Sequence, residues 1–206
     1  MLRTGLYLIT PDEPDTARLL ARVQPLLELG VAMLQYRNKS ADASLRREQA
    51  QPLLKLCRGA GVPLIINDDW RLAADIGADG SHLGVNDGEL RAARAAMPAG
   101  AILGASCYND LARAERAAAE GASYLAFGAF FTSTTKPLAR RAELSLLHDA
   151  ARFGLPRVAI GGISPDNARS ILAAGADFLA VIGAVFDAVD PAAVVREFHS
   201  CFEPTP

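Results

Sequence analysis

Short apolar runs alternate with longer segments of helical periodicity along the whole chain of 206 residues. The pattern occurs eight times, at about 26 residues per unit, and a glycine often stands where a helical pattern ends. Strands that alternate with helices pair in parallel, because each helix carries the chain back to the start of the next strand. Eight such units close naturally, so the sequence predicts an α/β fold, a single-domain (β/α)8 TIM barrel. An open doubly wound sheet is the alternative, and the count of eight favours closure.

The expected elements follow from this alternation. We expect strands at 6–9, 31–34, 62–66, 80–87, 101–105, 124–127, 157–160 and 178–182. Helices are expected at 17–27, from Ser40 or Asp42 to 58, at 72–75, 88–97, 111–120 and 143–152, from Pro165, and at 191–201. Proline suits the first position of a helix, because that position needs no N–H. One domain is expected over 1–206, with 203–206 as a frayed tail.

Composition restricts the partners. The chain has 21 Lys and Arg against 23 Asp and Glu, scattered along the sequence, so nucleic acid is not an expected partner. Three cysteines without a Cys-x-x-Cys pair predict neither a disulfide framework nor a zinc site. The longest apolar run, 178–186, is shorter than the roughly 20 residues of a membrane helix, and the start does not resemble a signal peptide. We therefore expect a cytoplasmic protein without membrane partners; the sequence leaves open whether it forms a homo-oligomer.

Two of the expected strands end in acidic residues. The apolar run 62–66 is followed by Asn67, Asp68 and Asp69, and the next strand runs into Asp87. In neighbouring parallel strands Asp68 and Asp87 would stand side by side, and two such carboxylates repel each other unless a cation lies between them. Mg²⁺ is held in this way, by one or two carboxylates together with substrate phosphates. The sequence therefore predicts that Asp68 and Asp87 bind Mg²⁺.

Basic residues and glycines complete the expected mouth of the barrel. Arg37, Lys39 and Lys136 suit phosphate oxygens. Glycines after the last two strands are typical of the phosphate site of such barrels, where backbone N–H groups converge. The mouth would collect Gln35, Arg37, Lys39, Asn67, Asp68, Asp87, Ser106, Ser133, Thr135, Lys136, Gly162 and Gly183. Such a set predicts binding of two anionic groups.

The expected mouth contains no well-placed histidine and no cysteine paired with a base. Asp68 and Asp87, if committed to a metal, are poor proton acceptors. The chemistry implied is departure of a diphosphate assisted by neutralisation of its charge, without acid–base catalysis by the protein.

Taken together and in order, the motifs resemble those of the thiamine-phosphate synthase family over nearly the whole chain. They are Gln35-x-Arg37-x-Lys39, Asn67-Asp68-Asp69, His82-Leu83-Gly84-x-x-Asp87, Ser106, Gly128 with Ser133-Thr134-Thr135-Lys136, and Ile160-Gly161-Gly162-Ile163. The resemblance implies a (β/α)8 barrel that uses Mg²⁺ to join aminopyrimidine-methyl diphosphate to a thiazole phosphate. Thiamine monophosphate and diphosphate are the implied products. Diphosphate would leave first, and the thiazole nitrogen would then attack the pyrimidine methylene cation.

The resemblance also implies roles for single residues. Asp68 and Asp87 would hold Mg²⁺. The diphosphate would be held by Asn67 and by the catalytic residues Arg37, Lys39 and Lys136. Gln35 and Ser106 would line the pyrimidine site. The thiazole and its phosphate would be held by Ser133, Thr135, Gly162, Ile182 and Gly183.

The chain departs from the family pattern at Val85, at Thr132-Ser133, at Gly183 and at Pro11. These departures leave open which hydroxyl meets which phosphate oxygen. They remove neither of the expected metal ligands.

Structural interpretations of the same residues also exist. Asp68 or Asp87 could cap the following helix, and Arg37 and Lys39 could form a solvated loop. His82 is interpreted as a hydrogen-bonded core residue, and Asp69 as making a structural bond. Two other functions are open: a thiazole tautomerase on the same barrel, and a non-catalytic phosphate sensor.

Overall fold

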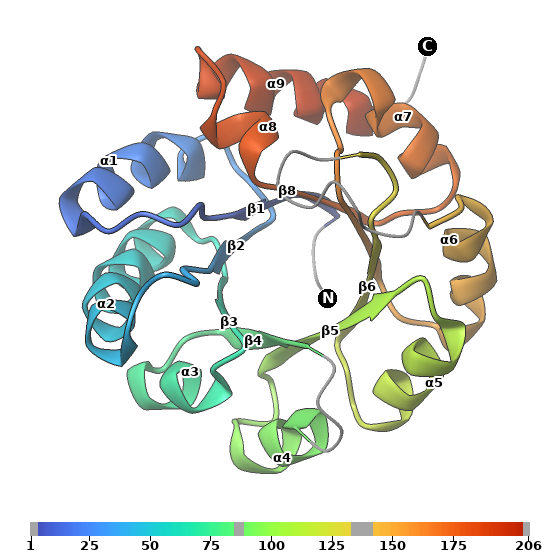
Figure 1. Cartoon of the computed structure of the whole chain (residues 1–206), viewed down its shortest axis with the longest axis horizontal. Helices are drawn as coiled ribbons and strands as arrows, with labels where there is room; N and C mark the ends of the chain where they lie inside the picture. Colours follow the sequence, from blue (N-terminus) through green and yellow to red (C-terminus); the bar gives the residue numbers. More distant parts are fainter. Residues whose placement is uncertain (1–3, 85–88, 133–141, 204–206) are drawn as a thin grey trace.

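The chain folds into a closed barrel of parallel strands surrounded by helices, as seen in a computed structural model that describes residues 4–84, 89–132 and 142–203. Each strand pairs with the next in sequence, and β8 pairs with β1 to close the ring. Figure 1 looks along the barrel, with the strands forming an inner ring and the helices an outer one. The (β/α)8 prediction is confirmed, and the open sheet is excluded.

In the described residues the strands are β1 (Gly5–Ile9), β2 (Met33–Tyr36), β3 (Leu64–Asn67), β4 (Gly80–Leu83), β5 (Ile102–Tyr108), β6 (Tyr124–Gly128), β7 (Arg157–Ile160) and β8 (Phe178–Val181). The helices are α1 (Thr16–Leu27), α2 (Ala43–Ala60), α3 (Trp70–Ile76), α4 (Glu89–Ala96), α5 (Leu111–Ala119), α6 (Ser145–Asp149) with the 3₁₀ turn η1 (Ala150–Phe153), α7 (Pro165–Ala173), α8 (Gly183–Phe186) and α9 (Pro191–Phe202).

Most helix starts depend on an aspartate. In α1, α2, α3, α5 and α9 the residue before the helix is aspartate, and its carboxylate accepts a hydrogen bond from a backbone N–H of the first turn. Asp42, not Ser40, caps α2. Pro165 is the first residue of α7, as expected.

Several element predictions are wrong in detail; β5, expected at 101–105, runs on to Tyr108. Strand β2 covers Met33–Tyr36 instead of 31–34, because Gln35 lies in the barrel interior, where Tyr7 satisfies its amide. Strand β4 ends at Leu83, short of Asp87, which lies outside the described residues. Helix α8, of four residues, was not predicted, because a single turn has no periodicity to read.

Two apolar regions hold the barrel together. One lies between the strands and the helices, and a smaller one fills the barrel interior with residues such as Ile65, Val158 and Phe178. Gly104 leaves space for the ring of Tyr124 inside the barrel, since a Cβ at this position would lie 2.0 Å from Tyr124 Cζ. The interior is therefore packed with side chains below the mouth, which leaves ligands to bind at its end.

Within the described part of the chain, no helix combines the length and the apolar character needed to cross a membrane. The tail expected at 203–206 lies, except for Glu203, outside the described residues.

Candidate active site at the carboxyl ends of the strands

The predicted site residues that the structure describes all lie in or just after the carboxyl ends of strands. They are Gln35, Arg37 and Lys39 from β2, Asn67 and Asp68 from β3, Ser106 from β5, Gly162 after β7, and Ile182 and Gly183 after β8. Because the strands are parallel, these ends share one rim of the barrel. Four predicted residues, Asp87, Ser133, Thr135 and Lys136, lie outside the described residues.

Asp68 is held in a fixed position at this rim. It has a left-handed backbone, with φ of 61°, which aspartate tolerates better than most residues. Its N–H donates to the carbonyl of His82 (2.8 Å), and its Oδ2 accepts from Asn67 Nδ2 (2.8 Å). The carboxylate lies over the end of β4, since a Cβ on Gly84 would be 3.6 Å from Asp68 Oδ1. The following residue, Asp69, caps α3 through Leu72 N–H, so Asp68 is not the helix cap and Asp69 makes the expected structural bond.

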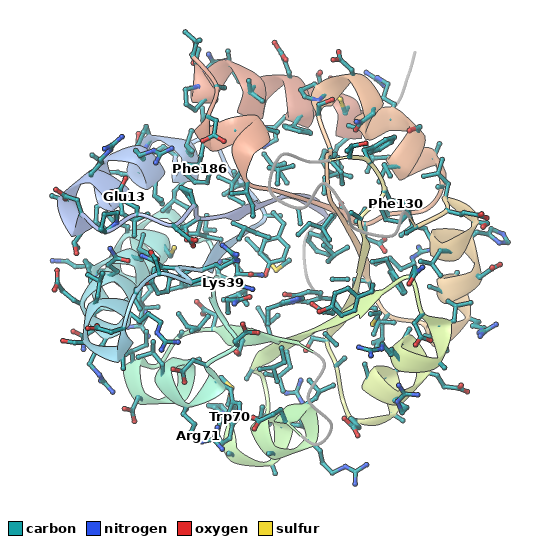
Figure 2. The ribbon with its side chains drawn as sticks, viewed as in Figure 1. Glu13, Lys39, Trp70, Arg71, Phe130 and Phe186 are labelled. Carbon is teal, nitrogen blue, oxygen red and sulfur yellow. The ribbon has the colours of Figure 1, made fainter. Side chains whose placement is uncertain are left out.

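Both flanks of the segment 85–88 lie against the β3–α3 unit. Gly84 lies beside Asp68, and on the other side Glu89 Oε2 accepts a hydrogen bond from Trp70 Nε1 (2.6 Å). Arg71 stacks on the Trp70 ring at 4.2 Å and also approaches Glu89. The side chains of Trp70 and Arg71, at the start of α3, lie outside the ring of strands on the side toward α4 (Figure 2). Gly84 and Glu89, the described residues on either side of 85–88, therefore both lie next to the unit that carries Asp68.

The donor set at this rim fits a hard dication. Among residues 4–84, 89–132 and 142–203, no three His, Cys, Asp or Glu side chains gather closely enough to bind a metal by themselves. Mg²⁺ needs only one or two carboxylates when phosphate oxygens and water supply the rest. The carboxylate of Asp68, oriented by Asn67, suits that role.

Arg37 and the backbone of Lys39 are held by residues that follow β1. Arg37 Nη1 lies 3.0 Å from Asp12 Oδ1, and the same oxygen accepts from the backbone N–H of Lys39 at 2.9 Å. Thr10 Oγ1 accepts from the N–H of Arg37 and donates to its carbonyl. Figure 2 shows Lys39 next to the ring of strands. Since both residues are tied to the end of β1, the segment is not a freely solvated loop.

A cavity of about 310 Å³ lies between the ends of β2 and β3. Its lining includes Lys39, Arg46, Asn67 and Asp68. Cations and a carboxylate around one space suit an anion bound together with a dication. Asp12 and Arg46 were missed in the sequence. Asp12 follows β1, the neighbour of β2, and Arg46 lies in the first turn of α2. Both could have been found as site residues only from the order of strands in the closed barrel.

Glycines shape the rim at β7. Gly162 has φ of +65°, and a Cβ there would lie 2.5 Å from the carbonyl oxygen of Thr132. The N–H of Phe131 donates to the carbonyl of Gly161 (3.0 Å), and Ala142 N–H donates to the carbonyl of Ala129 (2.8 Å). Both described flanks of the segment 133–141 are therefore anchored beside the ends of β6 and β7.

Gly183 begins α8, directly after Ile182 and the end of β8. A Cβ on Gly183 would lie 2.7 Å from Asp187 Oδ2, so this glycine also makes room for a neighbouring carboxylate. Gly162 and Gly183 share one part of the rim because β7 and β8 are paired.

A chain of hydrogen bonds crosses the barrel just below the mouth. Gln35 Nε2 donates to Tyr7 Oη (2.8 Å), and Tyr7 Oη lies 2.8 Å from Tyr124 Oη. Tyr124 Oη lies 2.9 Å from His82 Nδ1, and His82 Nε2 lies 2.8 Å from Ser106 Oγ. Burial lowers the pKa of His82 to about 4, so the ring is neutral at pH 7. The interpretation of His82 as a hydrogen-bonded core residue is confirmed.

Comparison with known proteins identifies the family. A family model described as thiamine monophosphate synthase matches residues 6–185. A thiamine-phosphate synthase of Xanthomonas campestris pv. campestris (strain 8004) is 56% identical over 198 residues, covering 96% of this chain and 95% of that protein. The chain belongs to the thiamine monophosphate synthase family.

Other relatives agree with this family. A thiamine-phosphate synthase of Methylobacillus flagellatus is 54% identical, covering 96% of this chain and 95% of that protein. A solved thiamine phosphate pyrophosphorylase from Pyrococcus furiosus superposes with a TM-score of 0.84 at 32% identity, covering 97% of this chain and 96% of that one. A solved 3-hexulose-6-phosphate synthase, 17% identical with a TM-score of 0.71 over 97% of this chain and all of that one, shares the fold alone. The residues matched by the thiamine monophosphate synthase model include every predicted site residue, from Gln35 to Gly183.

Proposed function

We propose that this chain joins 4-amino-2-methyl-5-hydroxymethylpyrimidine diphosphate to 4-methyl-5-(2-phosphoethyl)thiazole, giving thiamine monophosphate and diphosphate. It is then a transferase of thiamine biosynthesis. The observation that carries the proposal is the 56% identity, over nearly the full length of both chains, to a thiamine-phosphate synthase. The described part of the rim supports it, because Asn67 and Asp68 line one cavity together with the basic residues Lys39 and Arg46.

In this proposal Asp68 and Asp87 hold Mg²⁺, which when bound neutralises charge on the departing diphosphate. Arg37, Lys39, Asn67 and Lys136 bind the diphosphate oxygens. Arg37 and the backbone of Lys39 are held in place by Asp12 before any ligand arrives. Donors that are already oriented stabilise developing charge without further reorganisation.

The two rings occupy the remaining part of the mouth. Gln35 and Ser106 contact the pyrimidine, and Ser133, Thr135, Gly162, Ile182 and Gly183 hold the thiazole and its phosphate. No protein base is needed, because the bond to diphosphate breaks before the thiazole nitrogen attacks. His82 cannot readily serve as one, since it is buried and both ring nitrogens already have hydrogen-bond partners.

The partners in this proposal are two small molecules and Mg²⁺. A cytoplasmic location and the absence of nucleic-acid and membrane partners remain predictions, and a homo-oligomer remains open.

The proposal is tested by mixing both substrates with the protein and following thiamine monophosphate and diphosphate, with Mg²⁺ and with a chelator. We expect equal amounts of both products, only when Mg²⁺ is present. A second reaction with the thiazole phosphate alone separates the synthase from a tautomerase. Isomerisation without coupling would overturn the proposal, as would metal-independent binding that yields no product.

A further inference from the structure

The hydrogen-bond chain from Gln35 to Ser106 joins two residues of the mouth through the barrel interior. Its three inner members are buried: Tyr7 is 1% exposed, Tyr124 0% and His82 9%. The five residues come from β2, β1, β6, β4 and β5, so the chain spans the barrel. Apart from the two ends, its hydrogen bonds are made inside the protein, and each hydroxyl or ring nitrogen has to find its partner within the chain.

With Gln35 Nε2 directed at Tyr7, the chain has one direction in which every inner hydrogen has an acceptor. Gln35 Nε2 can only donate, so Tyr7 Oη accepts from it. Burial raises the pKa of Tyr7 and of Tyr124, so both hydroxyls keep their hydrogens. The hydrogen of Tyr7 has one acceptor within reach, Tyr124 Oη. Tyr124 must then donate to His82 Nδ1.

This direction fixes the form of the imidazole ring. A ring whose Nδ1 accepts from Tyr124 carries its hydrogen on Nε2. His82 Nε2–H therefore donates to Ser106 Oγ, 2.8 Å away. The opposite direction would require the Gln35 amide to be turned by 180°, so that Oε1 accepts from Tyr7 Oη where Nε2 now donates to it.

The two ends of the chain are left with complementary hydrogen-bonding capacity. Ser106 accepts from His82, so its own hydroxyl hydrogen is available as a donor. Gln35 Nε2 donates to Tyr7 inside the barrel, so Gln35 Oε1 is left to accept a hydrogen bond from a ligand. No buried polar side-chain atom among the described residues lacks a partner. Because no hydrogen bond reaches Gln35 Oε1, this oxygen keeps an edge that a ligand can contact.

We propose that Tyr7, Tyr124 and His82 are positioning residues that hold Gln35 as a hydrogen-bond acceptor and Ser106 as a donor toward the pyrimidine. The inference rests on the proposed function for the identity of the ligand. A 4-aminopyrimidine has an amino donor next to a ring-nitrogen acceptor, which matches one acceptor and one donor of the protein. A 4-oxopyrimidine has the reverse pattern, with a carbonyl acceptor next to a ring N–H. The chain therefore selects the amino ring.

The direction of the chain can be measured without substrate. The ¹⁵N shifts of the His82 ring, recorded on the wild-type protein at pH 7, distinguish the two neutral forms. We expect the form with hydrogen on Nε2, and in Tyr124→Phe we expect that preference to weaken, because Nδ1 then faces no donor. A wild-type ring with hydrogen on Nδ1, or a charged ring, would overturn the inference whatever the enzyme's activity.

The selectivity is measured with the 4-amino and 4-oxo pyrimidine diphosphates as competing substrates. In Tyr7→Phe the Gln35 side chain loses the hydrogen bond to Tyr7 Oη. Its amide can then rotate by 180°, which exchanges the positions of Oε1 and Nε2. We expect the ratio of kcat/KM between the two substrates to fall at least about tenfold, the size of one misplaced hydrogen bond. An unchanged ratio would contradict the inference.

The matched control is Val158→Ala, which opens a cavity in the apolar cluster that also contains Tyr7 and Tyr124 but removes none of the hydrogen bonds of the chain. It should lower stability but preserve the ratio. If Val158→Ala changes the ratio as much as Tyr7→Phe, the effect is general loosening and the positioning role is wrong. If the wild type couples neither substrate, the proposed function fails, while the ring measurement still decides the direction of the chain.

Discussion

The rim of the barrel is built in two ways. On the side of β1 to β5, which we call the side-chain half, the groups that face the mouth are held by other side chains: Gln35, Arg37, Asn67, Asp68 and Ser106. On the side of β7 and β8, the backbone half, the expected contacts are main-chain groups at Gly161, Gly162 and Gly183.

This difference matches the two kinds of ligand in the proposed reaction. Fixed side chains have a direction, so they can distinguish an amino from an oxo ring and place cations on one leaving group. Backbone N–H groups at glycines suit a phosphate, whose oxygens accept from many directions. We infer that ring selection and bond breaking depend on the side-chain half, and anchoring of the second substrate on the backbone half.

The largest expected effect is the loss of Asp68. Asp68→Ala should reduce coupling by about 10³-fold, similar to the loss of a preorganised group that stabilises developing charge. Stability should fall by only about 1 kcal/mol, because alanine tolerates the left-handed backbone at φ of 61° less well than aspartate, and circular dichroism separates this from the loss of coupling. Asp75→Ala, which removes an exposed helical aspartate, is the control and should keep full activity. Undiminished turnover in Asp68→Ala would refute its metal role.

The next effect is the pH dependence of the free energy of unfolding, which we attribute to His82 in the side-chain half. Burial lowers the pKa of His82 from 6.5 to about 4, so protons bind the unfolded chain more tightly. The free energy of unfolding that depends on neutral His82 is therefore fully present above pH 6.5. It falls by about 3 kcal/mol as the pH falls toward 4. Urea unfolding at pH 7 and pH 4.5 measures the loss. His82→Gln should reduce this difference, whereas His148→Asn, at an exposed histidine, should not. Equal pH dependence in wild type and His82→Gln would contradict the account.

In the backbone half, Gly162→Ala should cost about 1–3 kcal/mol of stability, because alanine is strained at φ of +65° and its Cβ meets the Thr132 carbonyl. We also expect the substitution to raise the KM for the thiazole phosphate more than the KM for the pyrimidine diphosphate. Gly59→Ala is the control, because this glycine lies in α2 with open space around it and should gain roughly 0.5–1 kcal/mol. If Gly162→Ala raises both KM values equally, the division between the two halves is wrong.

The smallest effect is expected at Asp12. Asp12→Asn keeps an oxygen for the N–H of Lys39 but removes the charge beside Arg37. The pair is partly exposed, so its loss should change kcat/KM for the pyrimidine diphosphate only about two- to fivefold. Steady-state kinetics at two salt concentrations checks this, since added salt should reduce the difference between wild type and variant. A loss as large as that of Asp68→Ala would place Asp12 in the catalytic machinery.

Much of the fold could be predicted from the sequence because apolar runs and helix caps are local signals. Asp15 and Pro165, for example, mark helix starts without knowledge of their neighbours. The end of β2 was misplaced because Gln35 is polar by composition but lies in the interior, where Tyr7 binds it. A local pattern cannot show a partner 28 residues away.

The site was predictable in part for the same reason. Asp68 and Lys39 follow strands and could be placed at the rim from strand order alone. Asp12 and Arg46 could not, because their roles depend on which neighbours the closed barrel gives them. The chain through Tyr124 was missed because its members come from five different strands. Asp87, Ser133, Thr135 and Lys136 stay predictions.

The central claim is that this protein couples the two substrates with the help of a metal held by Asp68 and Asp87. The most direct measurement is the release of diphosphate and thiamine monophosphate from both substrates as Mg²⁺ is titrated, in wild type and Asp68→Ala. We predict equal release of both products that rises with Mg²⁺ in the wild type and is nearly abolished in the variant. Coupling that proceeds unchanged in a chelator, or in Asp68→Ala, would contradict it.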